Sequence, residues 1–293
     1  MQQTKAIILD GKKVANEFTT CLKTKVEHLV KESGGKRPYL AVCLVGDDPA
    51  SQVYVGHKER AAAQVGIDSK TYRLPADTKQ EDLQKLILEL NGDEQVNGIL
   101  VQMPLPKGLD ADPVLLQINP MKDVDGLHPF NLGMLVAGHQ GLIPCTPFGI
   151  MRLLQSYRVE LTGKKAVVIG RSRLVGKPIA QLLMNEHATV TVVHSRTPEE
   201  EIQKIIKESD IVVAALGKPN FVKAEWLKEG SVAIDVGINR GSDGKLIGDI
   251  EYEKALSKVK AITPVPGGVG PLTVAHLLIN TVKAFEMQCF GYS

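Results

Sequence analysis

Short apolar runs alternate with longer segments of mixed polarity along almost the whole chain. The short runs are typical of buried strands, and the longer segments repeat apolar residues at the spacing of a helix face. This alternation predicts an α/β protein in which helices cover parallel sheets. We expect strands at residues 6–9, 40–45, 70–74, 98–102, 165–169, 189–193, 211–215, 232–236 and 261–263.

The helix pattern is clearest in residues 11–33, where apolar side chains follow one another at steps of four. Gly34 and Gly35 end this helix, and we expect Ser51 to cap the next one. The other expected helices span residues 51–65, 79–91, 148–157, 176–186, 198–207 and 272–287.

The length of 293 residues suits two domains of ordinary size. The segment Pro144–Pro147 predicts the boundary between them. We expect residues 1–147 to form the first domain and 148–271 to form a Rossmann-type, doubly wound second domain. The helix in 272–293 is expected to return to the first domain, and an active-site cleft is expected between the two.

Composition and charge exclude several classes of protein. Hydrophobic residues make up 43% and charged residues 23%, as in a packed globular chain. The net charge of +2 is too small to attract nucleic acid or an anionic membrane surface. No apolar stretch approaches the roughly 18 residues of a membrane span, and no signal sequence or presequence is expected at the N-terminus.

The four cysteines, Cys21, Cys43, Cys145 and Cys289, are far apart and show no CxxC spacing. Neither a disulfide framework nor a zinc site is expected from them. No metal site is predicted elsewhere, since two carboxylates in Lys122–Gly126 are too few ligands for calcium. A reducing compartment, the cytoplasm, is the expected location, although a processed organellar protein would show the same cysteine pattern.

A nucleotide-binding turn is predicted where the strand 165–169 ends. Gly170, Arg171, Ser172 and Gly176 follow an apolar strand and open a helix, an arrangement that presents free backbone N–H groups to a pyrophosphate. The turn departs from GxGxxG, because Ser172 replaces the second glycine and the last glycine falls one position late. Its place at the start of a βαβ series supports the interpretation.

The end of the next strand favours NADP over NAD. An NAD site carries an acidic residue about 20 residues after the turn, whereas this chain has Ser195 and Arg196 there. A hydroxyl and a guanidinium suit a 2′-phosphate. Glycine-containing loops after three later strands are expected to approach the cofactor or substrate ring closely. These are Ala215–Pro219, Asp235–Asn239, which includes Ile238, and Thr263–Pro271, which includes Pro266 and Gly267.

Candidate acid–base chemistry lies in the first half. Tyr54 and Lys58 are four residues apart and therefore share a helix face. Burial beside a tyrosine would lower the pKa of a lysine and suit it to proton transfer. Gln102 ends a strand, and the carboxylates of Lys122–Gly126 could accept two parallel N–H bonds from a guanidine-like edge.

Six segments in this order resemble the bifunctional methylenetetrahydrofolate dehydrogenase/cyclohydrolase family over nearly the whole chain. They are Ser51–Lys58, Gly98–Pro106, Lys122–Gly126, Pro144–Pro147, Gly170–Pro178 and Pro264–Pro271. The resemblance implies two domains, a homodimer, and NADP-dependent oxidation of 5,10-methylenetetrahydrofolate followed by hydrolysis to 10-formyltetrahydrofolate. The insertion that marks the NAD-using branch is absent, since only Asn185–Ala188 separates helix from strand.

The resemblance also implies roles for single residues. Lys58 would be the acid–base group, Gln102 its hydrogen-bond partner, and Tyr54 would stack on the folate. Asp125, with Pro266 and Gly267, would bind the substrate. The residues assigned to the cofactor are Gly170, Arg171, Ser172, Ser195, Arg196 and Ile238.

Three other hypotheses stay open at the level of sequence. They are a dehydrogenase with weak or no cyclohydrolase activity, a non-catalytic NADP-binding sensor, and an NADP dehydrogenase for a small hydroxy acid. The complete set of Tyr54, Lys58, Gln102 and Asp125 argues against a sensor. Arg152 is the only nearby candidate for binding a carboxylate substrate.

Overall fold

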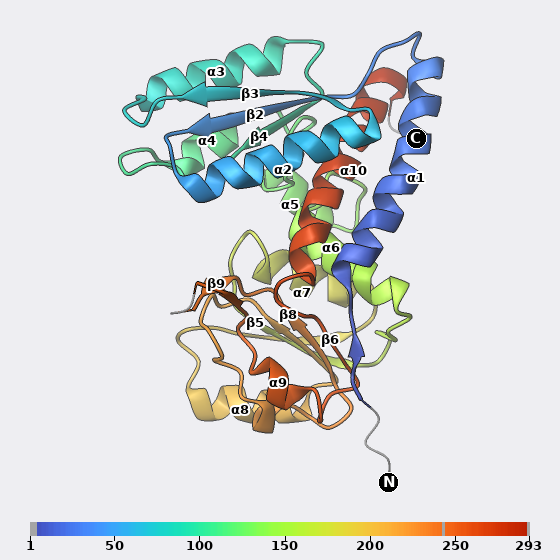
Figure 1. The fold of residues 1–293 in the computed structure, drawn as a ribbon, viewed down its shortest axis with the longest axis vertical. Helices are drawn as coiled ribbons and strands as arrows, with labels where there is room; N and C mark the ends of the chain where they lie inside the picture. Colours follow the sequence, from blue (N-terminus) through green and yellow to red (C-terminus); the bar gives the residue numbers. More distant parts are fainter. Residues whose placement is uncertain (1–4, 242–243, 292–293) are drawn as a thin grey trace. The chain divides into compact units, whose positions relative to one another are not determined.

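The computed structural model describes residues 5–241 and 244–291, which form two compact units (Figure 1). Unit 1 combines the N-terminal segment up to Ala15 with Thr146–Thr273, and unit 2 combines Asn16–Cys145 with the segment from Val274 onward. Each unit is α/β with its own parallel sheet, so the predicted fold class is confirmed.

Unit 2 is built on a three-stranded sheet in the order β3-β2-β4, with both pairs parallel. Its strands are β2 (Tyr39–Val45), β3 (Asp68–Leu74) and β4 (Gly98–Val101). Side chains alternate between the faces of a strand, and those of β2 enter two hydrophobic clusters. Leu40, Val42 and Leu44 belong to one cluster. Ala41, Cys43 and Val45 belong to the other.

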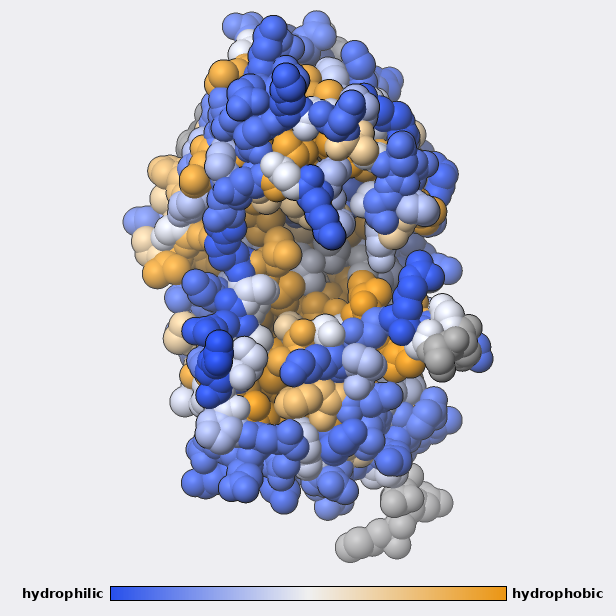
Figure 2. All heavy atoms as spheres, turned by 90° about the vertical axis from the view of Figure 1, so that its left-hand side faces the viewer, coloured by the Kyte–Doolittle hydropathy of each residue, from blue (hydrophilic) through white to orange (hydrophobic). Residues whose placement is uncertain are grey.

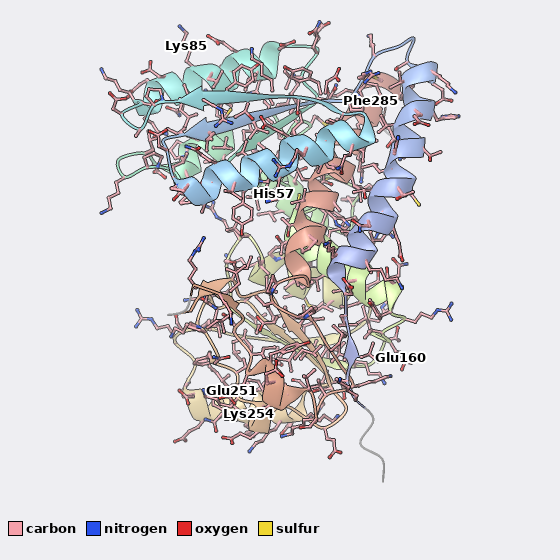
Figure 3. All side chains as sticks on the ribbon, viewed as in Figure 1. His57, Lys85, Glu160, Glu251, Lys254 and Phe285 are labelled. Atoms are coloured by element: carbon pink, nitrogen blue, oxygen red, sulfur yellow. The ribbon has the colours of Figure 1, made fainter. Side chains whose placement is uncertain are left out.

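Helices cover both faces of this sheet, with α2 and α3 on opposite sides in Figure 1. The α2 side also receives side chains from α1 and α10, among them the buried Phe285 (Figure 3). The helices that contribute to unit 2 are α1 (Gly11–Glu32), α2 (Pro49–Val65), α3 (Gln80–Gly92), α4 (Ala111–Gln117), α5 (Pro129–Val136) and α10 (Val269–Phe290).

Unit 1 contains a six-stranded parallel sheet in the order β1-β11-β8-β7-β5-β6. The order reverses at β5, which pairs with both β6 and β7, and such a reversal is where doubly wound sheets bind ligands. The strands are β1 (Ile7–Ile8), β5 (Lys165–Ile169), β6 (Thr189–Val193), β7 (Ile211–Ala214), β8 (Val232–Asp235) and β11 (Ala261–Ile262).

The remaining elements of unit 1 are helical apart from one small hairpin of β9 and β10, which pair antiparallel. They are α6 (Cys145–Ser156), α7 (Gly176–Asn185), α8 (Glu199–Glu208), the 3₁₀ turn Ala224–Trp226, β9 (Asn239–Arg240), β10 (Leu246–Ile247) and α9 (Tyr252–Ala255).

The first strand, β1, lies in a different sheet from the one expected. We expected residues 6–9 within the first domain, but β1 pairs with β11 at the edge of the unit 1 sheet. The Ile7 N–H donates to the Lys260 carbonyl at 2.9 Å, and the Leu9 N–H donates to the Ile262 carbonyl at 2.8 Å. An apolar run indicates a strand, but its pairing partner depends on which sheet edge is open.

Other differences are local. The N-cap of α2 is Asp48, whose carboxylate accepts the Ser51 N–H at 2.8 Å, and so the predicted cap at Ser51 was wrong. The two helices α4 and α5 were not predicted, because each is only about two turns long. Helix α6 begins at Cys145, inside the expected boundary segment, and not at residue 148.

The surface is mostly hydrophilic on the face drawn in Figure 2, with hydrophobic residues interspersed. In the described parts of the chain, we find no helix that is both long and apolar enough to span a bilayer.

Candidate functional site

Lys58 is positioned by α2, which is fixed at both ends. Asp48 caps its N-terminus, and Gly66 ends it with a left-handed φ of 82°. Tyr54 lies one turn before Lys58 and keeps 44% of its surface exposed. Figure 3 marks the neighbouring residue, His57, on the same helix. Lys58 itself is half-buried, and its Nζ donates to Gln102 Oε1 at 2.8 Å.

Gln102 presents a fixed carbonyl oxygen to this ammonium group. Its backbone N–H continues the sheet by donating to the Cys43 carbonyl at 2.9 Å. Its side-chain Nε2 donates to the Met103 carbonyl at 2.6 Å, so the amide oxygen faces Lys58. Because its backbone N–H and its side-chain NH₂ are both hydrogen-bonded, Gln102 offers Lys58 Nζ an acceptor in a fixed position.

Burial and one carboxylate set the protonation of Lys58. Desolvation lowers the pKa of Lys58, and the negative charges of Asp125 and of the Cys145 thiolate form oppose that shift. Desolvation also raises the pKa of Asp125, and the positive charge of Lys58 opposes it. The two groups are therefore electrostatically coupled, and a lysine in this setting releases its proton more readily than one in water.

The two carboxylates of the Lys122–Gly126 segment have separate roles. Asp123 is buried, and its Oδ2 accepts the His128 N–H and the Asn131 amide, each at 2.8 Å. It therefore holds the loop together, whereas the Asp125 side chain stays partly accessible. Gly126 has a φ of 73°, and an added Cβ would lie 2.5 Å from the backbone between Ile143 and Pro144, so glycine is needed there.

Two residues of this site were missed by sequence reasoning. The Cys145 thiol is buried beside Asp125 and donates to the Val124 carbonyl at 3.3 Å. Asn280 of α10 donates to the carbonyls of Val124 at 2.9 Å and Ile143 at 2.8 Å. The available signal was an asparagine directly after the apolar run Leu277–Ile279, because a buried amide requires partners.

The nucleotide turn in unit 1 joins β5 to α7 by close backbone contacts. Gly170 has a φ of 126°, and an added Cβ would overlap the Ala215 carbonyl oxygen. A Cβ on Gly176 would overlap the Gly170 carbonyl oxygen. The Ser172 hydroxyl accepts the N–H groups of Val175 at 3.1 Å and Gly176 at 3.4 Å, so its side chain shapes the turn at the second-glycine position.

Several predicted cofactor residues stand exposed at this carboxyl edge of the unit 1 sheet. Arg171 follows β5, and Ser195 and Arg196 follow β6. The turn after β6 is shaped by the His194 N–H, which donates to Thr197 Oγ1 at 3.1 Å, and the Arg196 N–H, which donates to His194 Nδ1 at 3.2 Å. Ile238, after β8, is 52% exposed.

The loop that carries Pro266 and Gly267 follows β11 and is held by the start of α1. The Lys12 N–H donates to the Gly267 carbonyl at 3.1 Å, and a Cβ on Gly11 would overlap the Gly268 carbonyl oxygen. Pro266 is exposed, and its peptide bond with Val265 is cis.

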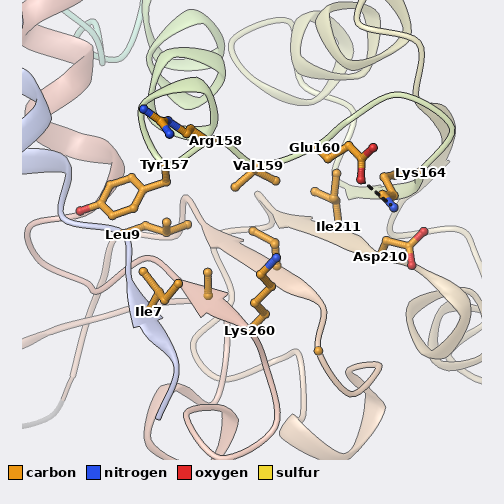
Figure 4. Close-up of a pocket in the computed structure, with 13 residues that line it drawn as sticks. Ile7, Leu9, Tyr157, Arg158, Val159, Glu160, Lys164, Asp210, Ile211 and Lys260 are labelled. Carbon is orange, nitrogen blue, oxygen red and sulfur yellow. Dashed lines mark ion pairs between the residues drawn. The ribbon is translucent and has the colours of Figure 1, made fainter. Parts of the chain in front are cut away.

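A small hollow of about 110 Å³ lies at the opposite, amino edge of the unit 1 sheet (Figure 4). Tyr157 lines it and accepts the Asp10 N–H at 3.0 Å through its hydroxyl. Glu160 and Lys164 form an ion pair of 3.1 Å at its rim. Most of its residues precede the strands or begin them, so it is separate from the nucleotide turn, which follows β5. Over the described ranges, no cluster of three or more histidine, cysteine or acidic side chains could hold a metal ion.

The fold and these residues define a two-unit α/β protein with a dinucleotide-type sheet in one unit and a lysine–amide–carboxylate group in the other. Two family models match the chain, one after the other along the sequence. The catalytic-domain model of tetrahydrofolate dehydrogenase/cyclohydrolase matches residues 9–125, and the NAD(P)-binding-domain model matches residues 144–289. The chain belongs to the tetrahydrofolate dehydrogenase/cyclohydrolase family, as the ordered motifs predicted.

Full-length relatives support this membership. The chain is 50% identical to the bifunctional protein FolD of Acetivibrio thermocellus, over 97% of this chain and 98% of the relative. A crystal structure of bifunctional FolD from Campylobacter jejuni has a TM-score of 0.92 at 45% identity, and the match covers 95% of this chain and 98% of that one. Trypanosoma brucei FolD, solved with NADP and an inhibitor, has a TM-score of 0.92 at 42% identity, and the match covers 97% of this chain and 98% of that one.

Proposed function

We propose that this chain oxidises 5,10-methylenetetrahydrofolate to the 5,10-methenyl form with NADP and then hydrolyses that product to 10-formyltetrahydrofolate. The observation that carries the proposal is Lys58, half-buried with its Nζ on the Gln102 amide and its pKa coupled to Asp125. A relative that is 50% identical over 97% of this chain and carries the name bifunctional protein supports both steps. In this role the protein belongs to one-carbon folate metabolism.

The residues of unit 2 supply proton transfer and substrate binding. Lys58 moves the proton in the hydrolytic step, and Gln102 holds its Nζ in place. Tyr54, exposed one turn away, offers a ring on which the folate can stack. Asp125 accepts N–H bonds from the amino-pyrimidine edge of the pterin, a guanidine-like group that a carboxylate binds in parallel.

The residues of unit 1 fit a dinucleotide phosphate. The turn precedes the N-terminus of α7, the positive end of the helix dipole, and Gly170 and Gly176 carry no side chain that would cover the backbone. Arg171, Ser195 and Arg196 are exposed at the same edge, where Ser172 shapes the turn. When bound, NADP supplies the hydride acceptor for the oxidation.

The finer assignments are part of the same proposal. Ile238 contacts the cofactor, and Pro266 with Gly267 contacts the folate. Residues 1–147 with 272–293 act as the folate-binding domain, and 148–271 act as the NADP-binding domain. The protein works as a homodimer in the cytoplasm, without nucleic acid, membrane or metal.

The test is spectrophotometric turnover by the purified chain with methylenetetrahydrofolate and either NADP or NAD. We expect rapid NADP reduction, followed at about 340 nm as nicotinamide chemistry requires, with little methenyl product detected after acidification. Methenyl accumulation would show that the cyclohydrolase step is weak. The absence of reduction with either dinucleotide would overturn the proposal.

Arg196→Ala tests the cofactor choice. Removing an exposed guanidinium that faces the 2′-phosphate is expected to raise the KM for NADP about tenfold, because a charge-assisted hydrogen bond contributes about 1.5–3 kcal/mol. The KM for NAD should change less than twofold, since NAD lacks that phosphate. Steady-state kinetics with both dinucleotides measures the two effects, and an equal rise for both would argue against the phosphate contact.

A further inference from the structure

Two buried carboxylates of unit 1, Asp235 and Asp249, have no role in the assignments above. Asp249 is completely buried and lies between β10 and α9. Its Oδ2 accepts the N–H groups of Leu216 at 2.7 Å and Gly217 at 2.9 Å. Its Oδ1 accepts the Lys218 N–H at 2.8 Å and the Asn239 amide at 2.9 Å. A carboxylate has about four acceptor positions, and all four are used.

These donors come from two loops at the carboxyl edge of the sheet. Leu216, Gly217 and Lys218 belong to residues 215–219, which we call the β7 loop. Asn239 ends residues 236–239, the β8 loop, which also carries Ile238. One buried side chain therefore ties both loops to the segment that precedes α9.

Asp235, at the end of β8, fixes the backbone of Asp249 by hydrogen bonds. Its Oδ1 accepts the N–H groups of Gly237 and Asp249, both at 2.9 Å, and its Oδ2 accepts the Ile250 N–H at 2.8 Å. Burial raises the pKa of Asp235 to about 6, and these three hydrogen bonds oppose the rise. Beyond Ile250, Glu251 forms ion pairs with Lys223 at 3.3 Å and Lys254 at 3.5 Å; Figure 3 labels Glu251 and Lys254.

Two glycines make room for the pair. A Cβ on Gly237 would overlap the Asp249 carboxylate, and a Cβ on Gly248 would overlap the Asp235 carboxylate. The β7 loop also meets the nucleotide turn, because the Ala215 carbonyl oxygen occupies the place of a Cβ on Gly170. The loops, the carboxylates and the turn are thus packed as one assembly.

We infer that Asp249 is a positioning residue for the dinucleotide site, and that it fixes the β7 and β8 loops where the nicotinamide half of the cofactor lies. The inference rests on the proposed NADP site and deepens it. In a doubly wound sheet the dinucleotide crosses the edge at the reversal of strand order. The 2′-phosphate residues follow β6, on one side of β5, and the β7 and β8 loops lie on the other. Asp249 itself touches no ligand in this arrangement.

The test compares NADP with adenosine 2′,5′-bisphosphate, which has the 2′-phosphate but no nicotinamide half. Asp249→Asn keeps the shape of the side chain, but its NH₂ group cannot accept N–H bonds, so either orientation loses two of the four. We expect the Kd for NADP to rise about tenfold. The Kd for the bisphosphate should change less than twofold, because its contacts are on the β6 side.

Two further variants keep the test informative if Asp249→Asn folds poorly. Asn239→Ala removes the link between Asp249 and the β8 loop, together with a 3.2 Å hydrogen bond to the Ile247 carbonyl, and should raise the Kd for NADP about threefold. Asp210→Asn is the matched control, because Asp210 lies at the other edge of the same sheet. Its carboxylate accepts the Lys165 N–H at 3.0 Å and forms an ion pair of 2.6 Å with Lys228. This variant should leave the Kd values for both ligands within twofold.

Cyclohydrolase activity, which consumes no dinucleotide, shows in every variant that unit 2 is folded, and it is expected to stay within twofold of the wild type. Weaker binding of NADP and of the bisphosphate alike would overturn the inference, because it would indicate general loss of unit 1 structure. An unchanged Kd for NADP would overturn it as well. Failure of the wild-type chain to bind NADP would instead refute the proposed function, so the two failures are distinguishable.

Discussion

Lys58→Met is expected to abolish the cyclohydrolase step, lowering its kcat by about 10²–10⁴-fold, the usual contribution of a general acid–base group. Methionine has a similar length and apolar stem but carries no proton to transfer. The Gln102 amide and Asp125 keep their own supports, at Met103 and in the Gly126 turn, so the site should remain folded. Affinity for NADP should stay within about threefold, because Lys58 lies in unit 2.

Lys58→Arg separates proton transfer from charge. Arginine stays protonated at any ordinary pH and so keeps the positive charge near Asp125 without releasing a proton. If Lys58 transfers a proton, both variants should be inactive in the hydrolysis of methenyltetrahydrofolate. If its charge alone matters, the arginine variant should retain most of the rate, and the assigned role would be wrong. Lys85→Met, at an exposed lysine of α3 (Figure 3), is the control and should behave as the wild type.

Gly176→Ala should have the opposite effect to Lys58→Met: it should lower dehydrogenase activity and leave cyclohydrolase activity almost unchanged. The added Cβ would overlap the Gly170 carbonyl oxygen and lie 2.7 Å from the Arg171 nitrogen, so the turn between β5 and α7 must open. In the proposed site, two charge-assisted N–H contacts from this turn to the pyrophosphate would contribute about 3–6 kcal/mol together, and their loss would correspond to a fall in NADP affinity of roughly 100-fold or more. Dehydrogenase activity should fall accordingly, with cyclohydrolase activity within twofold.

Titration with NADP and the two rate assays on the same preparation measure this separation. Gly163→Ala is the control in unit 1, because an added Cβ at Gly163 has no neighbour within 4 Å; its left-handed φ of 72°, which Gly176 does not share, strains the backbone only before β5. It should leave NADP affinity within twofold. A Gly176→Ala protein that binds NADP within threefold of the wild type would show that the turn does not hold the pyrophosphate.

Local patterns in the sequence predicted most of the elements and the family. The apolar runs at 40–45 and 165–169 became β2 and β5 almost residue for residue, because both strands are buried on two faces and show unbroken hydrophobicity. Tyr54 and Lys58 could be placed on one helix face from their spacing alone. The ordered motifs predicted the dehydrogenase/cyclohydrolase family, which the family models and relatives confirm.

What the sequence by itself determined was therefore the succession of strands, helices and glycine turns, since these follow from contacts between residues near in the chain. Only the tertiary structure decided that β1 joins the unit 1 sheet, that Asp123 supports a loop, and that the charge of Asp125 acts on Lys58. It also decided that Asn280 supports the Val124 carbonyl from 156 positions away, and that Asp249 binds two loops. A buried polar group acquires its role from the partners that folding brings to it, and no periodicity encodes those partners.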